Sequence, residues 1–198
     1  MKDDMTIIRD FWTNTIPLYE TPVFDEAVSM SKISTLKKDE YVIRNNEPII
    51  EYNFLLEGIA KVLPYENPDD EASYDMFIMH RKGIIPITST TGEGKEEIAR
   101  GDTVTLTDCV FLNVPSQQWF RLIYKYPEVY RIFVETLNSL NEMTWEKMNL
   151  KLENDAKVMV DWFYGKYPDV AAKLRKKDIA LFLGIAPETL SRFLKERD

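Results

Sequence analysis

The sequence predicts an α+β fold, in which a region of short β-strands is followed by one long helix and then by several short helices. Two observations predict this fold. Between residues 33 and 114, short segments rich in β-branched and aromatic residues alternate with turn residues. From Ser116 onward apolar residues recur at helical spacing, and Pro127 suits the first turn of a long helix that runs to about Leu152. The chain therefore divides into residues 1–126, 127–153 and 154–198.

Length and composition limit the classes of protein to which the chain can belong. Its 198 residues, 44% of them hydrophobic, suffice for one large domain and one small domain. No run of eighteen apolar residues is present and the first four residues lack the apolar core of a signal peptide, so a cytoplasmic protein without a membrane span is expected. A single cysteine, Cys109, and a single histidine, His80, cannot form an ordinary zinc site. Neither a metal nor another cofactor is expected.

The N-terminal part begins with a helical but irregular segment, residues 6–30, which Pro17 and Pro22 interrupt. Short strands are then expected at 33–36, 40–43, 52–57, 59–63, 74–79, 103–106 and 109–114, with turns at 37–40, 45–48 and 66–70. Many short strands at close spacing are typical of a small barrel or sandwich.

The long helix carries two apolar sides. One side follows a near-heptad spacing and consists of Phe133, Leu137, Leu140, Thr144 and Met148. The other consists of Val129, Ile132, Val134, Met143 and Trp145. A helix of about 25 residues has more apolar surface than one small domain can cover, so we expect the second side to pack on the β region and the first to form a homodimer interface. The alternative is a single amphipathic helix buried within the monomer.

The C-terminal residues 177–196 predict two short helices joined by a tight turn. Ile179, Ala180 and Leu183 share one apolar face, and Gly184 stands where a helix end needs a positive φ. A residue before proline avoids the helical region, so the second helix is expected to begin at about Pro187. Its buried stripe would be Leu190, Phe193 and Leu194, which leaves outside Glu188, Thr189, Ser191, Arg192 and Lys195.

Such a pair of helices is typical of a helix-turn-helix that places its second helix in a DNA groove. It also occurs in all-α proteins that do not bind DNA. The charge distribution favours the first interpretation. The chain carries a net charge of −8, yet residues 166–198 contain eight basic and five acidic residues. A basic end on an acidic body suits local contact with phosphates.

The motif Ile179-Ala180-x-x-Leu183-Gly184-Ile185-x-Pro187-Glu188-Thr189-Leu190-Ser191-Arg192 resembles the recognition motif of the Crp/Fnr transcription regulators. The segments 38–47 and 52–62 are similar to the opening strands of that family's sensor domain, with Asn46 where the family often has glycine. The resemblance implies a cyclic-nucleotide-binding-like jelly-roll, a dimerisation helix and a C-terminal helix-turn-helix. The family usually adds a two-stranded wing, which we expect to be absent because the chain stops at Asp198.

The resemblance also implies roles for the exposed residues of the second helix. Glu188 and Arg192 would read bases, which agrees with the chemistry: arginine can donate twice to guanine, and glutamate accepts from the amino group of cytosine. The expected phosphate contacts are Thr189, Ser191, Lys195, Lys176 and Lys177. The implied partners are double-stranded DNA, a second copy of the chain and RNA polymerase.

The nucleotide pocket of the family is poorly matched. Its cyclic-nucleotide binders use a Phe-Gly-Glu segment and an arginine followed by serine or threonine. Here the corresponding segment 81–88 has a glycine but no adjacent glutamate, and the one arginine of segment 96–103 is about one residue out of register. The candidate ligand-binding residues are Gly83, Ile84, Arg100 and Thr103. The effector is unassigned, and a regulator that does not respond to cyclic AMP is predicted.

Two other functions remain open. The β region could hold a cyclic nucleotide or another small molecule on which DNA binding depends, or the chain could be a protein-interaction module that has lost DNA binding. An enzyme is not expected, because no nucleophile with a base partner, no metal cluster and no convincing carboxylate pair is found in the sequence.

Overall fold

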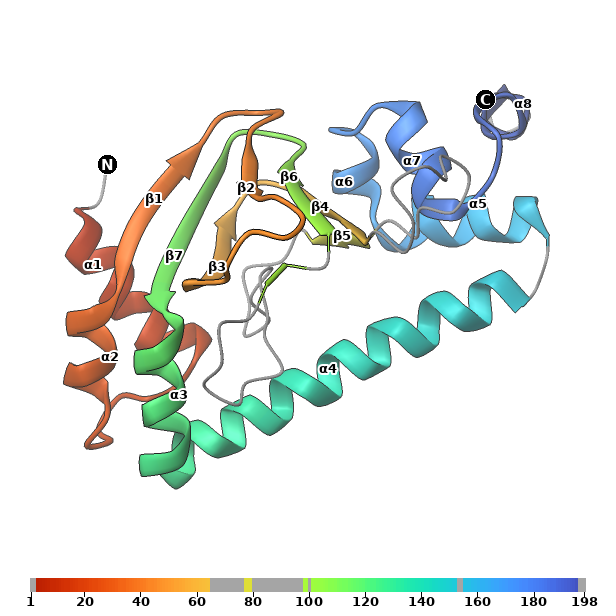
Figure 1. The fold of residues 1–198 in the computed structure, drawn as a ribbon. Helices are drawn as coiled ribbons and strands as arrows, with labels where there is room; N and C mark the ends of the chain where they lie inside the picture. The colour runs from red at the N-terminus through yellow and green to blue at the C-terminus, as the bar shows by residue number, and fades with distance from the viewer. Residues whose placement is uncertain (1–2, 65–76, 80–97, 100, 153–154, 196–198) are drawn as a thin grey trace.

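The computed structural model describes residues 3–64, 77–79, 98–99, 101–152 and 155–195. It confirms the α+β fold: an N-terminal β-roll, a long helix and a C-terminal helical unit follow one another along the chain (Figure 1). The β-roll consists of strands β1 to β7, and the C-terminal helical unit consists of helices α5 to α8.

Three short helical segments precede the β-roll, as the irregular pattern predicts. They are α1 (Asp4–Asp10), the π-helix η1 (Phe11–Thr15) and α2 (Phe24–Met30). The side chain of Asp3 caps α1 by accepting from the Thr6 amide at 3.0 Å. Trp12 is fully buried and packs edge-on against Phe11 at 4.9 Å between ring centroids. These segments therefore form part of the core at one end of the β-roll.

The seven described strands form two antiparallel sheets. The first has the order β1 (Lys32–Leu36), β7 (Cys109–Pro115), β3 (Glu51–Glu57). The second has the order β2 (Tyr41–Ile43), β6 (Gly101–Thr105), β4 (Ala60–Pro64), β5 (Phe77–Met79). A separate core cluster contains the buried side chains of Leu55, Ala60, Cys109 and Phe111, which come from strands of both sheets. Each strand lies within about two residues of its predicted place, except that of the expected strand 74–79 only residues 77–79 are described.

Backbone conformations with positive φ occur in the turns of the β-roll. Asn46 has φ 66°, a left-handed conformation that asparagine tolerates, in the turn after β2, and Asp39 has φ 65° in the turn after β1. Gly58, between β3 and β4, has φ 100° and lies so close to the chain of Asp108 and Cys109 that a side chain would collide with them.

Helix α3 (Ser116–Lys125) leads into α4 (Pro127–Leu152), which has the predicted bounds. Figure 1 shows α4 running from the end of the β-roll at which α2 and α3 lie to the C-terminal helical unit. Val129 and Ile132 belong to the N-terminal core, whereas Leu150 belongs to the core of the C-terminal helical unit. One prediction about its faces is wrong: Trp145 is 53% exposed and does not pack on the β-roll.

The C-terminal helical unit contains α5 (Ala156–Lys166), α6 (Pro168–Ala171), α7 (Lys176–Leu183) and α8 (Pro187–Lys195). Asp155 caps α5 by accepting from the Lys157 amide at 2.8 Å. Gly165 lies in the last turn of α5, which ends at Lys166, and Tyr167 is its C-cap directly before Pro168. In the part of the chain that the structure describes, no helix is both long enough and apolar enough to cross a membrane.

Candidate nucleic-acid interface

The turn between α7 and α8 is closed by backbone hydrogen bonds around Gly184. This glycine has φ 67°, and its amide donates to the Leu181 carbonyl at 3.1 Å. The amide of Ile185 donates to the Ala180 carbonyl at 3.0 Å. The two bonds make up a Schellman motif, in which a left-handed residue reverses the chain just after a helix. This motif sets the angle at which α8 leaves α7.

Helix α8 is held by its apolar side. Leu190 is fully buried, and Phe193 and Leu194 are half-buried against the same core. The opposite side exposes Glu188, Arg192 and Lys195, while Thr189 and Ser191 are half-buried. Glu188 and Arg192 are four residues apart, so they stand one above the other on one face of the helix. That face can present an acceptor and a bidentate donor to a groove.

The first turn of α7 is basic. Lys176 and Lys177 are exposed, and Arg175 is the residue at the helix N-cap. Next to them Asp178 is buried, with only 3% of its surface exposed. Its carboxylate accepts from Nε of Arg175 at 2.7 Å and lies 3.4 Å from Nζ of Lys61, which belongs to β4 of the β-roll. The exposed lysines are therefore the ones free to meet a phosphate.

The charge state of Asp178 follows from these partners. Burial favours the protonated carboxyl, but the hydrogen bond from Arg175 and the positive charge of Lys61 outweigh burial, so the pKa of Asp178 lies below its ordinary value. The carboxylate is thus ionised at neutral pH and holds both cations. No local sequence pattern predicts this contact, because Lys61 and Asp178 are 117 positions apart.

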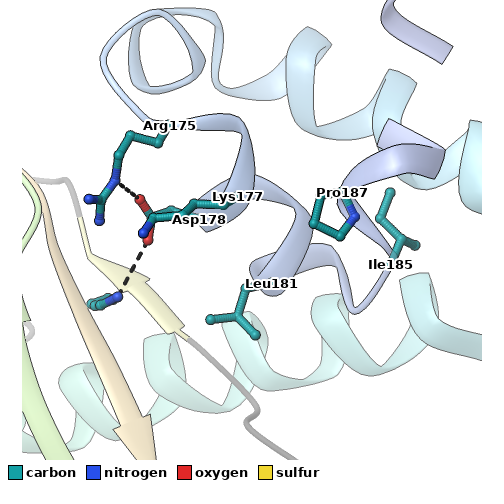
Figure 2. A pocket seen from close by; sticks show the side chains of 7 residues that line it. Arg175, Lys177, Asp178, Leu181, Ile185 and Pro187 are labelled. Atoms are coloured by element: carbon teal, nitrogen blue, oxygen red, sulfur yellow. Dashed lines mark hydrogen bonds and ion pairs between the residues drawn. The ribbon is translucent and has the colours of Figure 1, made fainter. Parts of the chain in front are cut away.

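A cavity of about 330 Å³ lies beside this contact, between the β-roll and the α7–α8 turn. Figure 2 shows Arg175, Lys177 and Asp178 at one side of it and Ile185 and Pro187 at the other. Leu181 and Lys61 complete the described lining. The first turn of α7 and the start of α8 therefore border a hollow shared with the β-roll.

The exposed apolar residues of α4 form a second candidate interface. Five large side chains of this helix are at least two-fifths exposed: Tyr130, Leu137, Trp145, Met148 and Leu152. Of the five predicted dimer residues, Leu137, Thr144 and Met148 are exposed, whereas Phe133 and Leu140 are half-buried. Tyr130, Leu137 and Met148 are spaced by seven and eleven residues, which returns each to nearly the same face of a helix. An apolar stripe therefore remains uncovered along α4.

The candidate effector pocket is described only in part. Thr103 is buried in β6, paired with Ile43 on one side and Val62 on the other. The other three candidates, Gly83, Ile84 and Arg100, lie outside the described residues. Among the residues that the structure does describe, no group of three histidine, cysteine or acidic side chains is arranged to hold a metal ion.

Comparison with known proteins identifies the fold. No protein-family model matches the chain, and no curated protein matches it. The solved structure of FixK2 from Bradyrhizobium japonicum is similar with a TM-score of 0.73 at 16% identity, over 84% of this chain and 83% of that one. The c-di-GMP-responsive global regulator CLP of Xanthomonas campestris is similar with a TM-score of 0.61 at 15% identity, over 90% and 91% of the two chains. A CooA mutant from Carboxydothermus hydrogenoformans gives a TM-score of 0.60 at 15% identity, over 85% and 76%. The chain therefore has a Crp/Fnr-like fold.

Proposed function

We propose that this chain, which has the fold of the Crp/Fnr regulators, is a homodimeric transcription regulator that binds specific DNA sequences through α8. The observation that carries the proposal is the exposure of Glu188 and Arg192, one helical turn apart, on a helix whose other side is anchored by Leu190. Arginine donates twice to guanine and glutamate accepts from cytosine, so the pair would read base edges in the major groove.

The basic first turn of α7 supports the same interface. Lys176 and Lys177 are exposed on the helix that precedes the recognition helix, where a helix-turn-helix crosses the DNA backbone. Thr189, Ser191 and Lys195 flank the base-reading face on α8 and would contact phosphates. Phosphate contacts position the helix, and the two base-reading side chains provide the sequence preference.

The uncovered stripe on α4 supports the homodimer. Pairing of two copies along Leu137 and Met148 would cover apolar surface that the monomer leaves in water. A symmetric dimer would present two copies of α8 to successive major grooves about 34 Å apart. The dimer residues of this proposal are Phe133, Leu137, Leu140, Thr144 and Met148.

The test begins by selecting preferred duplexes from a random DNA library with the full-length chain. Binding of the selected and of scrambled duplexes is then measured for the wild type and for Arg192→Ala. The expected loss on the selected sequence is about 1–3 kcal/mol with a relaxed sequence preference. Arg121→Ala, which removes an exposed arginine on α3, is the matched control and should bind as the wild type does. An equal loss on every duplex tested would refute the base-reading role.

The phosphate contacts have a separate test. Lys177→Ala should weaken binding to all sequences about equally and reduce the slope of log affinity against log salt by about one. Gel shifts at several salt concentrations measure that slope. A DNA affinity that does not change with salt concentration would argue against phosphate contacts and would instead favour the protein-interaction module.

We further propose that cyclic AMP is not the signal for this regulator. The segment 81–88 lacks the glutamate that cyclic-nucleotide binders of the family place beside the glycine. Titration calorimetry with cyclic AMP and cyclic GMP should show no heat. Heat with a defined stoichiometry would favour the alternative, a nucleotide sensor with ligand-dependent DNA binding.

A further inference from the structure

Arg192, the donor of the proposed base-reading pair, lies against an aromatic ring. Its guanidinium carbon Cζ stands over the ring of Phe193, 4.9 Å from the ring centroid. A guanidinium and an aromatic face attract each other within about 6 Å. The long side chain of Arg192 is therefore held near both of its ends, by α8 at the backbone and by this ring at the charged group.

The core of the C-terminal helical unit fixes the ring itself. Phe193 is half-buried and packs against the cluster that contains Leu190, whereas Arg192 beside it is exposed. Part of the ring thus lies in the core, and part lies at the surface of α8 where the guanidinium meets it. A leucine at position 193 could also anchor the helix, but it has no aromatic face. The phenylalanine therefore supplies something that anchoring alone does not require.

The contact leaves the hydrogen-bond donors of Arg192 available. A guanidinium carries five N–H donors in its plane, whereas a ring that stacks on it uses the face of that plane. Arg175 is the contrast, because its Nε donates to the buried Asp178 at 2.7 Å. Glu188 stands one helical turn from Arg192, but within the described parts of the chain the two form no ion pair. The ring thus restrains Arg192 without occupying the groups that would bind guanine.

We propose that Phe193 is a positioning residue, which restricts the conformations of Arg192 before DNA binds and so strengthens the reading of guanine. The proposal rests on the proposed DNA-binding function and adds a residue that sets its sequence preference. An exposed arginine has many rotamers, and fixing one of them on binding costs entropy. A side chain that is already restricted in the free protein loses less entropy when it meets a base.

The quantity that tests the proposal is discrimination, the ratio of the dissociation constants for a scrambled duplex and for the selected duplex. A cation–π contact at an exposed site favours the held conformation about two- to fivefold, so Phe193→Leu should reduce discrimination by about that factor. Phe193→Tyr keeps an aromatic face and should retain wild-type discrimination. Fluorescence anisotropy with the two duplexes measures both constants for each variant.

A double-mutant cycle separates positioning from support of the helix. In the Arg192→Ala background the ring has no guanidinium to hold, so Phe193→Leu should cause no further loss of discrimination. Glu188 remains in that background and supplies the discrimination on which a loss can be measured. A residue that only anchors α8 would cause the same fractional loss in both backgrounds, and that result would overturn the proposal.

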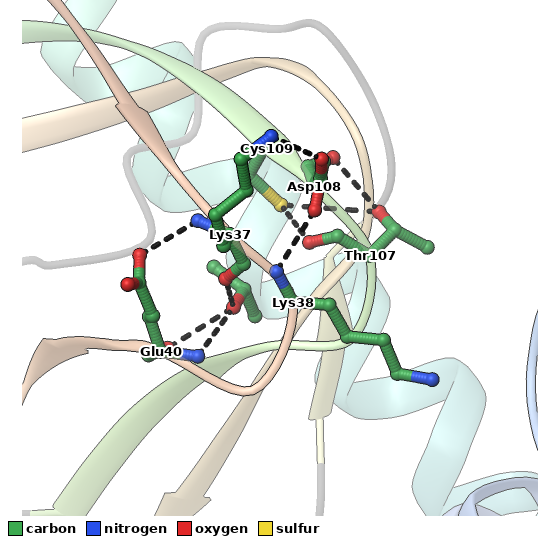
Figure 3. Close-up of polar contacts among 7 residues, drawn as sticks. Lys37, Lys38, Glu40, Thr107, Asp108 and Cys109 are labelled. Carbon is green, nitrogen blue, oxygen red and sulfur yellow. Dashed lines mark hydrogen bonds and ion pairs between the residues drawn. The ribbon is translucent and has the colours of Figure 1, made fainter.

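Two controls lower stability without changing α8. Phe182→Leu makes the same change at another half-buried phenylalanine of the same core. Figure 3 shows Asp108 of the β-roll, which pairs with Nζ of Lys37 at 2.7 Å and accepts from the Lys38 amide at 3.0 Å; Asp108→Asn weakens both contacts. Both variants should keep wild-type discrimination, and thermal unfolding measures the stability of each. A loss in either that matches the loss in Phe193→Leu would assign the effect to stability and overturn the proposal.

Side-chain NMR detects the contact without DNA. Protons over the face of an aromatic ring are shifted upfield, so the δ-methylene protons of Arg192 should resonate upfield in the free chain with isotope-labelled arginine. Arg192→Lys assigns the resonance. Phe193→Leu should move it downfield, and Phe182→Leu should leave it in place. A wild-type resonance without the upfield shift would mean that the contact does not form in solution and would overturn the proposal.

The outcomes distinguish this proposal from the proposed function. If the resonance moves but Phe193→Leu discriminates as well as the wild type, the positioning role is overturned while DNA binding stands. If the wild type itself does not distinguish the selected duplex from the scrambled one, the proposed function fails and the positioning role fails with it. A moved resonance, together with a loss of discrimination that disappears in the Arg192→Ala background, supports both.

Discussion

Two glycines of the C-terminal helical unit permit a matched test of how the turn before α8 is built. Gly165 and Gly184 are both exposed, and a Cβ added at either would meet no atom within 4 Å. Only the backbone differs: Gly184 has φ 67°, whereas Gly165 lies within helix α5. Replacing each by alanine therefore isolates the conformational cost.

The expected effects have opposite signs. A left-handed residue other than glycine costs roughly 1–2 kcal/mol, and alanine also reduces the entropy of the unfolded chain by about 0.4–1 kcal/mol. Gly184→Ala should therefore lower the free energy of unfolding by about 1 kcal/mol. Gly165→Ala should raise it by about 0.5 kcal/mol, because alanine is the better residue inside a helix. Gly184→Asn should cost less than Gly184→Ala, since asparagine visits this conformation more readily.

Urea unfolding at a fixed chain concentration measures the three free energies. Hydrogen exchange of the α7 and α8 amides shows whether the loss is local to the helices that flank the turn. Equal losses for the two alanine variants would mean that contacts and not φ set the cost. A gain for Gly184→Ala would refute the Schellman turn as the structure describes it.

Three further predictions concern the other features of the fold. Leu137→Lys places a charge in the apolar stripe, so it should raise the dissociation constant of the dimer tenfold or more, about 1.4 kcal/mol. Sedimentation should then show monomer. Asn138→Lys, one position away, is the control and should stay dimeric. Gly58→Ala should lower the free energy of unfolding by about 2–5 kcal/mol. The added Cβ would meet the Asp108 carbonyl at 2.5 Å and Sγ of Cys109 at 2.6 Å, and alanine would also be strained at φ 100°. A loss no larger than that of Gly184→Ala would contradict this packing. The ionised form of Asp178 should stabilise the fold fully above about pH 5, and this contribution should be lost as the pH falls through 3.8 and below. The difference in the free energy of unfolding between the wild type and Asp178→Asn, measured by urea titration, should therefore shrink over that range. A difference that grows on acidification would contradict this prediction.

Local sequence patterns predicted most of the elements. The bounds of α4 follow from Pro127 and a helical period, and the α7–α8 turn follows from Gly184 and Pro187. The face of α8 that points outward could also be predicted, because helical spacing places Leu190 inward and Glu188 outward. Periodicity reports which side of an element is apolar, and for α8 a single core covers that side.

The sequence pattern was less informative where two partners could cover the same helix, or where segments far apart in the sequence come into contact. Trp145 is apolar but lies on the uncovered side of α4, which the sequence cannot distinguish from the side packed on the chain. The short helix α6 was not expected. The contact of Lys61 with Asp178 depends on how two separate units dock, and no local rule predicts it.

The position of α4 in two cores has a mechanical consequence. One end is packed among the N-terminal side chains and the other among those of the C-terminal helical unit. Its 26 residues span about 39 Å at about 1.5 Å per residue. Tilting such a lever by about 10° about one end displaces the other by about 7 Å, a fifth of the roughly 34 Å between successive major grooves. In the proposed dimer, a small rotation where the two copies meet would therefore decide whether both copies of α8 reach the same duplex.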